Sequence, residues 1–337
     1  MASVPKEIAI DVGTSTLRVA IRGKGLVLEE PTVVAVDTRS REVLALGRDA
    51  AELVGRTAEH VVAVRPLRQG AITDFDMAAR MLHHVLVSCG VSRLSRAKVL
   101  LTVPSASTSI ERRALQQAAR AAGAAHAVLL EATMAAAIGL DLPINEPVGS
   151  VIVDLGAGTT ETGVISLGGV VAAKALRLGG LDLNGAIQSA VRHEHDLVVG
   201  DEVAEDLKIR LGSADRRTSA VMAEVHGRRP RTAERAIETI SSTLVDAAIA
   251  DHVTALVAGT SACLAEAPPE LAQDAIFEGL HLVGGGSLLD GFAELLSEKT
   301  SVPVRVASNP ARVVIEGAAR CLEDLNRLRP LFVSADR

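Results

Sequence analysis

The chain contains almost no aromatic residues: its 337 residues include no Trp, no Tyr and only four Phe. Hydrophobic residues nevertheless make up 48% of the sequence. The core must therefore be built from aliphatic side chains, mainly Ala, Val, Leu and Ile. The length allows two compact domains, each with a core of its own.

Cysteine is also scarce. Cys89, Cys263 and Cys321 form an odd and widely spaced set. Such a set fits buried thiols in a reducing cytoplasm better than it fits disulfides or a metal site.

The chain lacks an excess of positive charge and lacks long apolar runs. Its formal net charge is -6 at pH 7, so we expect no general nucleic-acid surface. Met1–Lys6 has no apolar core, so we expect neither a signal peptide nor an anchor there. No run reaches the roughly 18 apolar residues that a membrane span requires.

Two short stretches, Ile8–Thr16 and Val151–Thr160, read like copies of each other. Each is an apolar, β-branched run that ends in an aspartate, Asp11 in the first and Asp154 in the second. A glycine turn with hydroxyl side chains follows, and then a second apolar run. This pattern is typical of a β-hairpin with a tight, glycine-containing tip.

The tips of these hairpins are suited to binding phosphate. Glycine lets backbone N–H groups come close to an anion, and hydroxyl groups add further donors. An aspartate at a strand end can hold a hydrated Mg²⁺ that bridges to phosphates. Two ordinary hairpins remain the alternative, but a pair half a chain apart favours duplicated domains that clamp a nucleotide phosphate from both sides.

A third stretch, His281–Leu289, is an apolar strand followed by three glycines and a helix start. A backbone without side chains can approach a flat ring closely, and the N–H groups at a helix start favour anions. The chain has no G-x-x-x-x-G-K-[ST] motif, so the nucleotide site is not a P-loop.

With these three motifs the chain resembles the superfamily of actin, sugar kinases and Hsp70, and within it the bacterial cell-shape actins of the MreB/Mbl family. The resemblance extends over nearly the whole chain. The stretches most specific to the family are Lys24–Pro31, Arg65–Phe75, Ile110–Ala114, Met134–Gly139 and Ala267–Ala272.

This resemblance implies an α/β protein with the actin-like ATPase fold: two similar RNase H-like domains around a nucleotide cleft, each with a smaller subdomain. Domain I is expected to comprise residues 1–145 plus 312–337, with its small subdomain at about 31–74. Domain II is expected to comprise residues 146–311, with its small subdomain at about 181–244.

Local patterns along the chain predict alternating strands and helices. We expect Glu29, Glu30 and Pro31 to turn between two strands. Thr232–Ala265 reads as a long helical region with a break near Gly259. Ala311–Leu328 is predicted to be the last helix and to return to the first domain.

The resemblance also implies a set of ATP and Mg²⁺ ligands. Asp11 and Asp154 are expected to order Mg²⁺ through water and, with Thr159, to form the catalytic set. Glu205 and Lys208 match positions that contact ribose and adenine; without the resemblance they would be a surface ion pair worth ~0.3–0.5 kcal/mol. The implied nucleotide-binding residues are Gly13, Thr14, Ser15, Gly156, Ala157, Gly158, Thr159, Glu205, Lys208, Gly284, Gly285 and Gly286.

The chain departs from the family at the catalytic glutamate. Family members usually carry Glu-Glu-Pro-Met before the Ala-Ala-Ala-Ile-Gly helix, and the glutamate before that proline helps to position the attacking water. Here the segment reads Glu131-Ala132-Thr133-Met134. Ala132 therefore occupies the catalytic position and Glu131 is its neighbour. Because such groups contribute roughly 10²–10⁴-fold to a rate, we expect impaired hydrolysis. Ala157 also replaces a family glycine, which is tolerable if its φ angle stays negative.

These features imply an actin-like ATP-binding protein that assembles into cytoskeletal filaments and acts in cell shape or cell-wall morphogenesis. As an enzyme it would be at most a slow ATPase. One alternative is an ATP-binding scaffold that neither hydrolyses ATP nor polymerises. A second is a small-molecule kinase of the same superfamily, which would need an inserted substrate lobe and a catalytic base facing the γ-phosphate.

The expected partner is a second copy of the chain in a filament, together with membrane proteins of cell-wall synthesis or morphogenesis. We expect no nucleic-acid partner. The loop Val91–Lys98 offers only Leu94 among basic residues, so membrane contact through it would be weak. The predicted location is cytoplasmic, at most peripheral at the inner face of the membrane.

Overall fold

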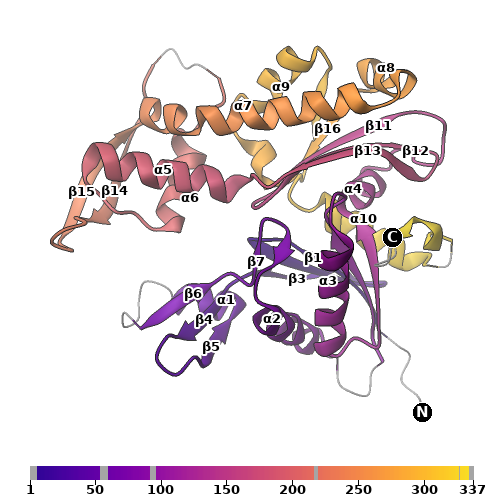
Figure 1. The fold of residues 1–337 in the computed structure, drawn as a ribbon, viewed down its shortest axis with the longest axis horizontal. Helices are drawn as coiled ribbons and strands as arrows, with labels where there is room; N and C mark the ends of the chain where they lie inside the picture. The colour runs from indigo at the N-terminus through magenta and orange to yellow at the C-terminus, as the bar shows by residue number, and fades with distance from the viewer. Residues whose placement is uncertain (1–5, 54–59, 92–95, 216–218, 326, 334–337) are drawn as a thin grey trace.

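The computed structural model describes residues 6–53, 60–91, 96–215, 219–325 and 327–333. It is organised around two β-sheets that lie in different halves of the molecule (Figure 1). The first sheet has the strand order β18-β10-β9-β1-β2-β3. Its central strand β1 pairs antiparallel with β2 and parallel with β9. The strands are β1 (Glu7–Val12), β2 (Thr16–Ile21), β3 (Gly25–Pro31), β9 (Lys98–Val103), β10 (His126–Glu131) and β18 (Phe332–Val333).

The second sheet repeats this plan with the order β13-β12-β11-β16-β17. Its central strand β11 again pairs antiparallel with the next strand, β12, and parallel with a strand from much later in the chain, β16. The two expected hairpins therefore occupy equivalent positions in two similar sheets. The strands are β11 (Ser150–Leu155), β12 (Thr160–Ser166), β13 (Gly169–Leu176), β16 (Leu280–Val283) and β17 (Val304–Val306).

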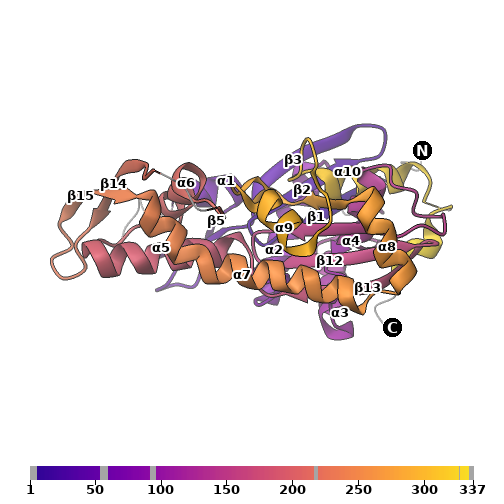
Figure 2. The same cartoon turned by 90° about the horizontal axis from the view of Figure 1, so that it is seen from above.

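Helices form layers outside and between the two sheets (Figures 1 and 2). The outer face of the first sheet packs on α2 (Phe75–Ser88) and α3 (Ser109–Ala121) in one aliphatic core. The outer face of the second packs on the long helix α7 (Ser242–Glu266) in another. Between the sheets lie α4 (Ala132–Gly139) and α10 (Val313–Glu323), which belong to a third core that draws residues from both sheets.

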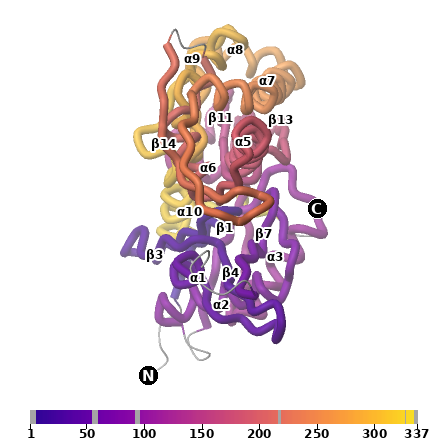
Figure 3. The backbone as a smooth tube through the Cα atoms, turned by 90° about the vertical axis from the view of Figure 1, so that its left-hand side faces the viewer, coloured from indigo at the N-terminus to yellow at the C-terminus, as the bar shows by residue number. Residues whose placement is uncertain are grey.

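Each half carries a smaller group of elements at one end of the molecule, seen end-on in Figure 3. These groups lie within the two ranges expected for small subdomains, although the domain boundaries themselves stay a prediction. The first group contains β4 (Val34–Asp37), β5 (Val43–Leu46), α1 (Gly47–Leu53), β6 (Val61–Val64), β7 (Leu67–Arg68) and β8 (Ala71–Ile72). The second contains α5 (Gly180–His195), α6 (Asp201–Leu211), β14 (Met222–Arg228) and β15 (Arg235–Ser241).

The prediction of a helical region over Thr232–Ala265 with a break near Gly259 was wrong in two respects. Its first part is the strand β15, which pairs antiparallel with β14 along its whole length. The rest is the unbroken helix α7. Gly259 does not end the helix but allows a close contact, because a Cβ atom there would lie 2.5 Å from Leu176 Cδ1 of β13.

Two further expectations were corrected. Glu29, Glu30 and Pro31 do not form a turn but are the last residues of β3, which pairs with β2. The last helix α10 spans Val313–Glu323 only, and Phe332–Val333 returns as the edge strand β18 beside β10. A neighbouring strand with unpaired backbone groups decides this last assignment, and local sequence does not contain that information.

Among the described helices, α7 has the length and apolar composition that could cross a membrane. Its face with Val245, Ile249, Val253 and Leu256 is fully or almost fully buried in the core of the second half. This face of α7 therefore packs within the protein, although only 33% of its apolar window is buried. Leu94 and residues 1–5, on which the membrane and anchor expectations rest, lie outside the described residues.

Candidate functional site

A cavity of about 720 Å³ opens between the two sheets, and elements of both halves line it. Its size is that of a pocket for a small molecule or cofactor. All the residues expected to bind nucleotide or Mg²⁺ line this one cavity, and so does Ala132, whereas Glu131 does not appear in its lining. The structure thus brings together residues that lie as far apart in the chain as Asp11 and Gly286, while their roles stay predictions.

The two hairpin tips form opposite walls of the cavity and are closely packed. A Cβ atom on Gly13 would lie 2.5 Å from the carbonyl oxygen of Thr16, and one on Gly158 would overlap Thr14 Oγ1 of the other tip. Gly156 N donates to the carbonyl of Thr159 at 2.9 Å, which closes the second tip. Only glycine permits this approach of backbone to backbone. Ala157 keeps a negative φ, since it is absent from the residues with positive φ, so its methyl group is accommodated without strain.

Asp11 and Asp154 lie near the ends of β1 and β11, where the tips begin. Asp11 Oδ1 accepts a hydrogen bond of 2.7 Å from Thr102 Oγ1. Burial raises the pKa of Asp11, an effect partly offset by Thr102 and by the charge of Arg18. Burial, together with the negative charge of Asp11, raises the pKa of Asp154 to about 7. Two buried carboxylates that repel each other are suited to receive a divalent cation.

Glu161 is a residue of this site that the sequence analysis missed. It lies on β12 directly opposite Asp154 in the β11–β12 pair, so both side chains point to the same face. Its side chain is buried, and Oε2 accepts a hydrogen bond of 2.9 Å from Ser105 N. Burial first, and then the charge of Asp154, raises its pKa to about 8. The available signal was a lone carboxylate near the start of an otherwise uncharged strand.

Glu161→Gln should stabilise the nucleotide-free protein at alkaline pH. The pKa of Glu161 is about 8 in the folded state against an ordinary value of 4.5, so folding takes up a proton between these values. Wild-type stability then falls by up to about 1.4 kcal/mol per pH unit. We expect the variant to gain roughly 1–3 kcal/mol in unfolding free energy at pH 8 and almost nothing near pH 4.5.

Urea denaturation between pH 4.5 and pH 9 measures this difference. Glu224→Gln, at an exposed position of β14, is the matched control and should show no such trend. A gain for Glu161→Gln that is the same at both ends of the pH range would contradict the assignment.

A second group of polar residues lies at the α5 and α6 side of the cavity. Lys208 Nζ is 2.8 Å from Glu205 Oε2 and also donates to the carbonyl of Gly180 at 3.1 Å. Glu205 Oε2 accepts from Asn184 Nδ2 at 2.7 Å. The pair therefore ties α6 to the first turn of α5 and is more than a surface ion pair. Asn184 Oδ1 is buried and has no hydrogen-bond partner within the described part of the chain, which suits a ligand hydroxyl or amine.

The three glycines after β16 complete this side. Gly284 has a φ of +83°, and a Cβ atom on Gly284 or Gly286 would overlap residues at the end of β11. Gly285 faces open space, since no neighbouring atom of the described residues lies within 4 Å of the position that a Cβ atom would take. The turn is thus held tightly from behind and presents bare backbone to the cavity, which fits a flat ring. Gly285–Leu288 continues as the 3₁₀ helix η1.

Ala132 and Glu131 are placed very differently. Ala132 is the first residue of α4, and its methyl group lines the cavity. Glu131 ends β10, and its Oε1 is 3.7 Å from Arg112 Nη2 on α3. Thr133, at the family's proline position, shares a hydrogen bond of 2.7 Å between its Oγ1 and Ser105 Oγ. The carboxylate that this chain retains is therefore paired with a cation away from the cavity.

The donor set fits a nucleotide and a hydrated Mg²⁺. Two glycine tips face each other, two carboxylates stand behind them, and an unpaired amide oxygen lies near the bare glycine turn. Within the described residues, no group of three or more His, Cys, Asp or Glu side chains could hold a metal ion. Asp11 and Asp154 are the carboxylates that would hold Mg²⁺ through its waters, and the ion would neutralise phosphate charge.

Comparison with known proteins identifies the family to which this chain is similar. The family model described as MreB/Mbl protein matches residues 5–330. The chain is 36% identical to the cell shape-determining protein Mbl of Bacillus subtilis over 324 residues, which cover 96% of this chain and 97% of the relative. It is 38% identical to the cell shape-determining protein MreB of Escherichia coli over 323 residues, which cover 94% of this chain and 93% of the relative.

Solved structures share the fold. MreB5 of Spiroplasma citri bound to ADP superimposes with a TM-score of 0.88 at 28% identity, over 97% of this chain and 98% of that one. A MamK double helical filament gives a TM-score of 0.79 at 20% identity, over 95% and 99% of the two chains. The expected actin-like fold is therefore confirmed, and the chain belongs to the MreB/Mbl family of cell shape-determining, actin-like proteins.

Proposed function

We propose that this protein binds ATP with Mg²⁺ in the cavity between its two sheets and assembles with copies of itself into filaments that act in cell shape. The observation that carries the proposal is the pair of hairpin tips, each preceded by a buried aspartate, that face each other across one cavity. MreB5 of Spiroplasma citri has been solved with ADP and with AMPPNP, which supports a nucleotide in the equivalent place.

Each side of the cavity has a distinct role in this proposal. Gly13, Thr14 and Ser15 on one wall, with Gly156, Ala157, Gly158 and Thr159 on the other, hold the phosphates. Glu205, Lys208 and the turn Gly284–Gly286 hold the nucleoside. When bound, Mg²⁺ supplies charge neutralisation at the phosphates, and Asp11 and Asp154 order its waters. We assign residues 1–145 plus 312–337 to one domain and 146–311 to the other.

Hydrolysis is expected to be slow, because Ala132, which lines the cavity, stands where the family resemblance places the water-positioning glutamate. The same observation favours a second candidate function, that of an ATP-binding scaffold which neither hydrolyses ATP nor polymerises. The near full-length match to cell-shape relatives favours the filament over that scaffold and over a small-molecule kinase. Wall-synthesis membrane proteins as partners, and a cytoplasmic place with contact to the inner membrane face, belong to the same proposal.

Nucleotide-dependent sedimentation tests the proposal. We expect the wild-type protein to pellet with ATP and Mg²⁺ more than without nucleotide, because end-to-end contacts between identical subunits give open filaments. Asp154→Ala removes one cation-ordering carboxylate and also a buried repulsion. It should therefore fold but lose the ATP-dependent pellet.

Electron microscopy of the pellets and calorimetry of ATP binding complete the test. Wild-type protein that binds ATP yet stays monomeric over a wide range of salt and concentration would favour the scaffold. A well-folded wild-type protein without any ATP binding would refute the central claim.

A further inference from the structure

We propose that Arg18 is a phosphate-binding residue of this site, and that it supplies charge neutralisation which makes nucleotide binding less dependent on Mg²⁺. This inference rests on the proposed function, because it assumes a nucleotide in the cavity. It concerns a residue that is not among the nucleotide-binding residues expected from the sequence.

Arg18 is placed at the cavity by the register of the first hairpin. It lies on β2 directly opposite Asp11, so both side chains leave the sheet on the same face. Its neighbours Leu17 and Val19 are fully buried, as expected for the other face of the strand. The Arg18 side chain is only 15% exposed and lines the cavity. A charged residue in an otherwise apolar strand therefore points at the first phosphate-binding tip.

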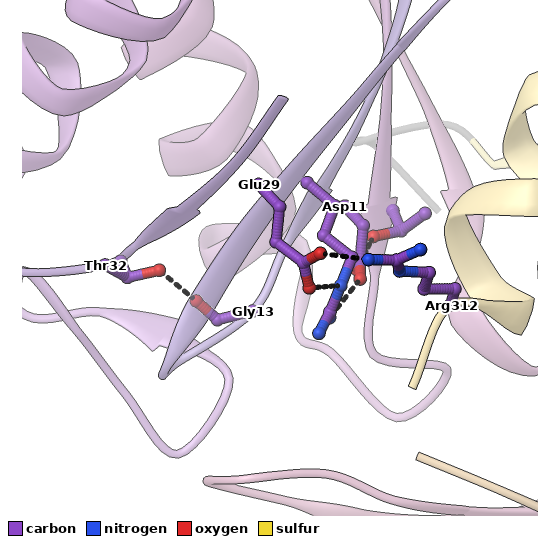
Figure 4. A network of polar contacts seen from close by, with 7 residues as sticks. Asp11, Gly13, Glu29, Thr32 and Arg312 are labelled. Atoms are coloured by element: carbon purple, nitrogen blue, oxygen red, sulfur yellow. Dashed lines mark hydrogen bonds and ion pairs between the residues drawn. The ribbon is translucent and has the colours of Figure 1, made fainter. Parts of the chain in front are cut away.

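The guanidinium group contacts two carboxylates, that of Glu29 closely and that of Asp11 more loosely. Arg18 Nε donates to Glu29 Oε1 at 2.8 Å, and Glu29 Oε2 in turn accepts from Arg312 Nη2 at 2.9 Å (Figure 4). Arg18 Nη1 is 3.7 Å from Asp11 Oδ2, which is longer than a hydrogen bond. The outer nitrogens of Arg18 can thus turn to an incoming anion while Glu29 keeps the side chain in place.

The carboxylates in the cavity favour a cation beside the first tip. Asp11, Asp154 and Glu161 all face the inner part of the cavity, and a polyphosphate adds further negative charge. Three cationic side chains line the cavity in the described part of the chain, namely Arg18, Arg65 and Lys208. Lys208 is bonded to Glu205 and Gly180 at the α5 and α6 side, and Arg65 Nη2 is 3.8 Å from Asp201 Oδ2. Of the three, Arg18 is the one that lies directly opposite Asp11, beside the first tip.

Arginine is suited to this task because its planar guanidinium group binds phosphate oxygens through two parallel hydrogen bonds. The anchor on Glu29 reduces the conformational entropy that such a contact would otherwise lose. Arg18 would therefore move its outer nitrogens from Asp11 to the phosphates when nucleotide enters. That movement leaves the Asp11 carboxylate available to the waters of Mg²⁺.

Calorimetry of ATP binding, with Mg²⁺ and with EDTA, tests the assignment. We expect Arg18→Gln to weaken ATP binding by roughly 10- to 100-fold, and by more in EDTA than in Mg²⁺. Arg18→Lys, which keeps the charge but not the paired donors, should lose less. Arg22→Gln is the matched control: Arg22 directly follows β2 and also pairs with a carboxylate, that of Glu7, but does not line the cavity.

The outcomes separate the possible roles. If Arg18 only neutralises Asp11, then Arg18→Gln would not change the affinity for ATP in EDTA. In Mg²⁺ the affinity for ATP would stay the same or increase. This result would overturn the inference but not the proposed function. Wild-type protein that binds no ATP would overturn both the inference and the proposed function. Should Arg18→Gln fail to fold, Arg18→Lys decides alone, and equal affinity to wild type in EDTA and in Mg²⁺ would refute the contact.

Discussion

Replacing Ala132 by Glu is expected to raise the rate of phosphate release about 10²-fold or more while ATP affinity stays unchanged. Ala132 is the first residue of α4 and lines the cavity, so a longer side chain there would extend towards the phosphates. A carboxylate at this position can orient the attacking water and accept its proton. These contributions appear in the transition state and not in the ground state, and for that reason the rate should change without the affinity.

We expect that Glu131 does not supply this function in the wild-type chain. Its carboxylate is 3.7 Å from Arg112 Nη2, and burial raises its pKa while Arg112 opposes the shift. Thr133→Pro can accompany Ala132→Glu, because proline is tolerated in the first turn of a helix. The double variant loses the hydrogen bond between Thr133 and Ser105, so it also shows whether that bond matters for the backbone before α4.

Single-turnover hydrolysis at saturating ATP measures the effect for wild type, Ala132→Glu and Glu131→Ala. We expect slow turnover in the wild type and in Glu131→Ala, and faster turnover only when position 132 is a glutamate. Fast turnover in the wild type that is lost in Glu131→Ala and unchanged in Ala132→Glu would show that Glu131, and not position 132, is the catalytic position.

Gly317→Ala is expected to destabilise the protein by about 3 kcal/mol, a large fraction of the stability of an ordinary domain. Helices α4 and α10 cross between the two sheets with their backbones in contact. A Cβ atom on Gly317 would overlap the carbonyl oxygen of Ala135, and one on Gly139 would overlap that of Val313. Backbone atoms cannot yield as a flexible side chain can, so the helices must separate.

This separation should also disturb the site. Helix α4 begins with Ala132, and α10 carries Val314; both residues line the cavity. Arg312, which holds Glu29, directly precedes α10. A small shift of the pair would therefore move the first wall of the cavity, and ATP binding should weaken along with stability.

Urea denaturation of Gly317→Ala against Gly185→Ala measures this effect. Gly185 lies within α5, and no neighbouring atom in the described part of the chain lies within 4 Å of its Cβ position. Alanine there should therefore stabilise the protein by roughly 0.5–1 kcal/mol through helix propensity. If both variants unfold at the same denaturant concentration as wild type, the contact between α4 and α10 is looser than the structure indicates.

The local sequence determined the two hairpins, the glycine turn after β16 and the pairing of Glu205 with Lys208. In each case the information lies within a few residues. A β-branched run followed by glycine and hydroxyl residues can form its hydrogen bonds with the next run, as β1 does with β2 and β11 with β12. Residues three apart on a helix share a face wherever that helix packs. Ala132 could also be identified from its position before Met134–Gly139, because the register of a short segment does not depend on the fold.

Only the tertiary structure decided which segments face the cavity and which pair with a distant strand. Arg235–Ser241 is a strand because β14 offers it unpaired backbone groups, and Phe332–Val333 is a strand because β10 does. Glu161 and Arg18 belong to the site because each lies opposite an aspartate on a paired strand, where burial and neighbouring charge give the side chain its properties. The hydrogen-bond partners, the burial and the charged neighbours of these residues come from segments far away in the chain. A short segment of the sequence therefore does not contain this information.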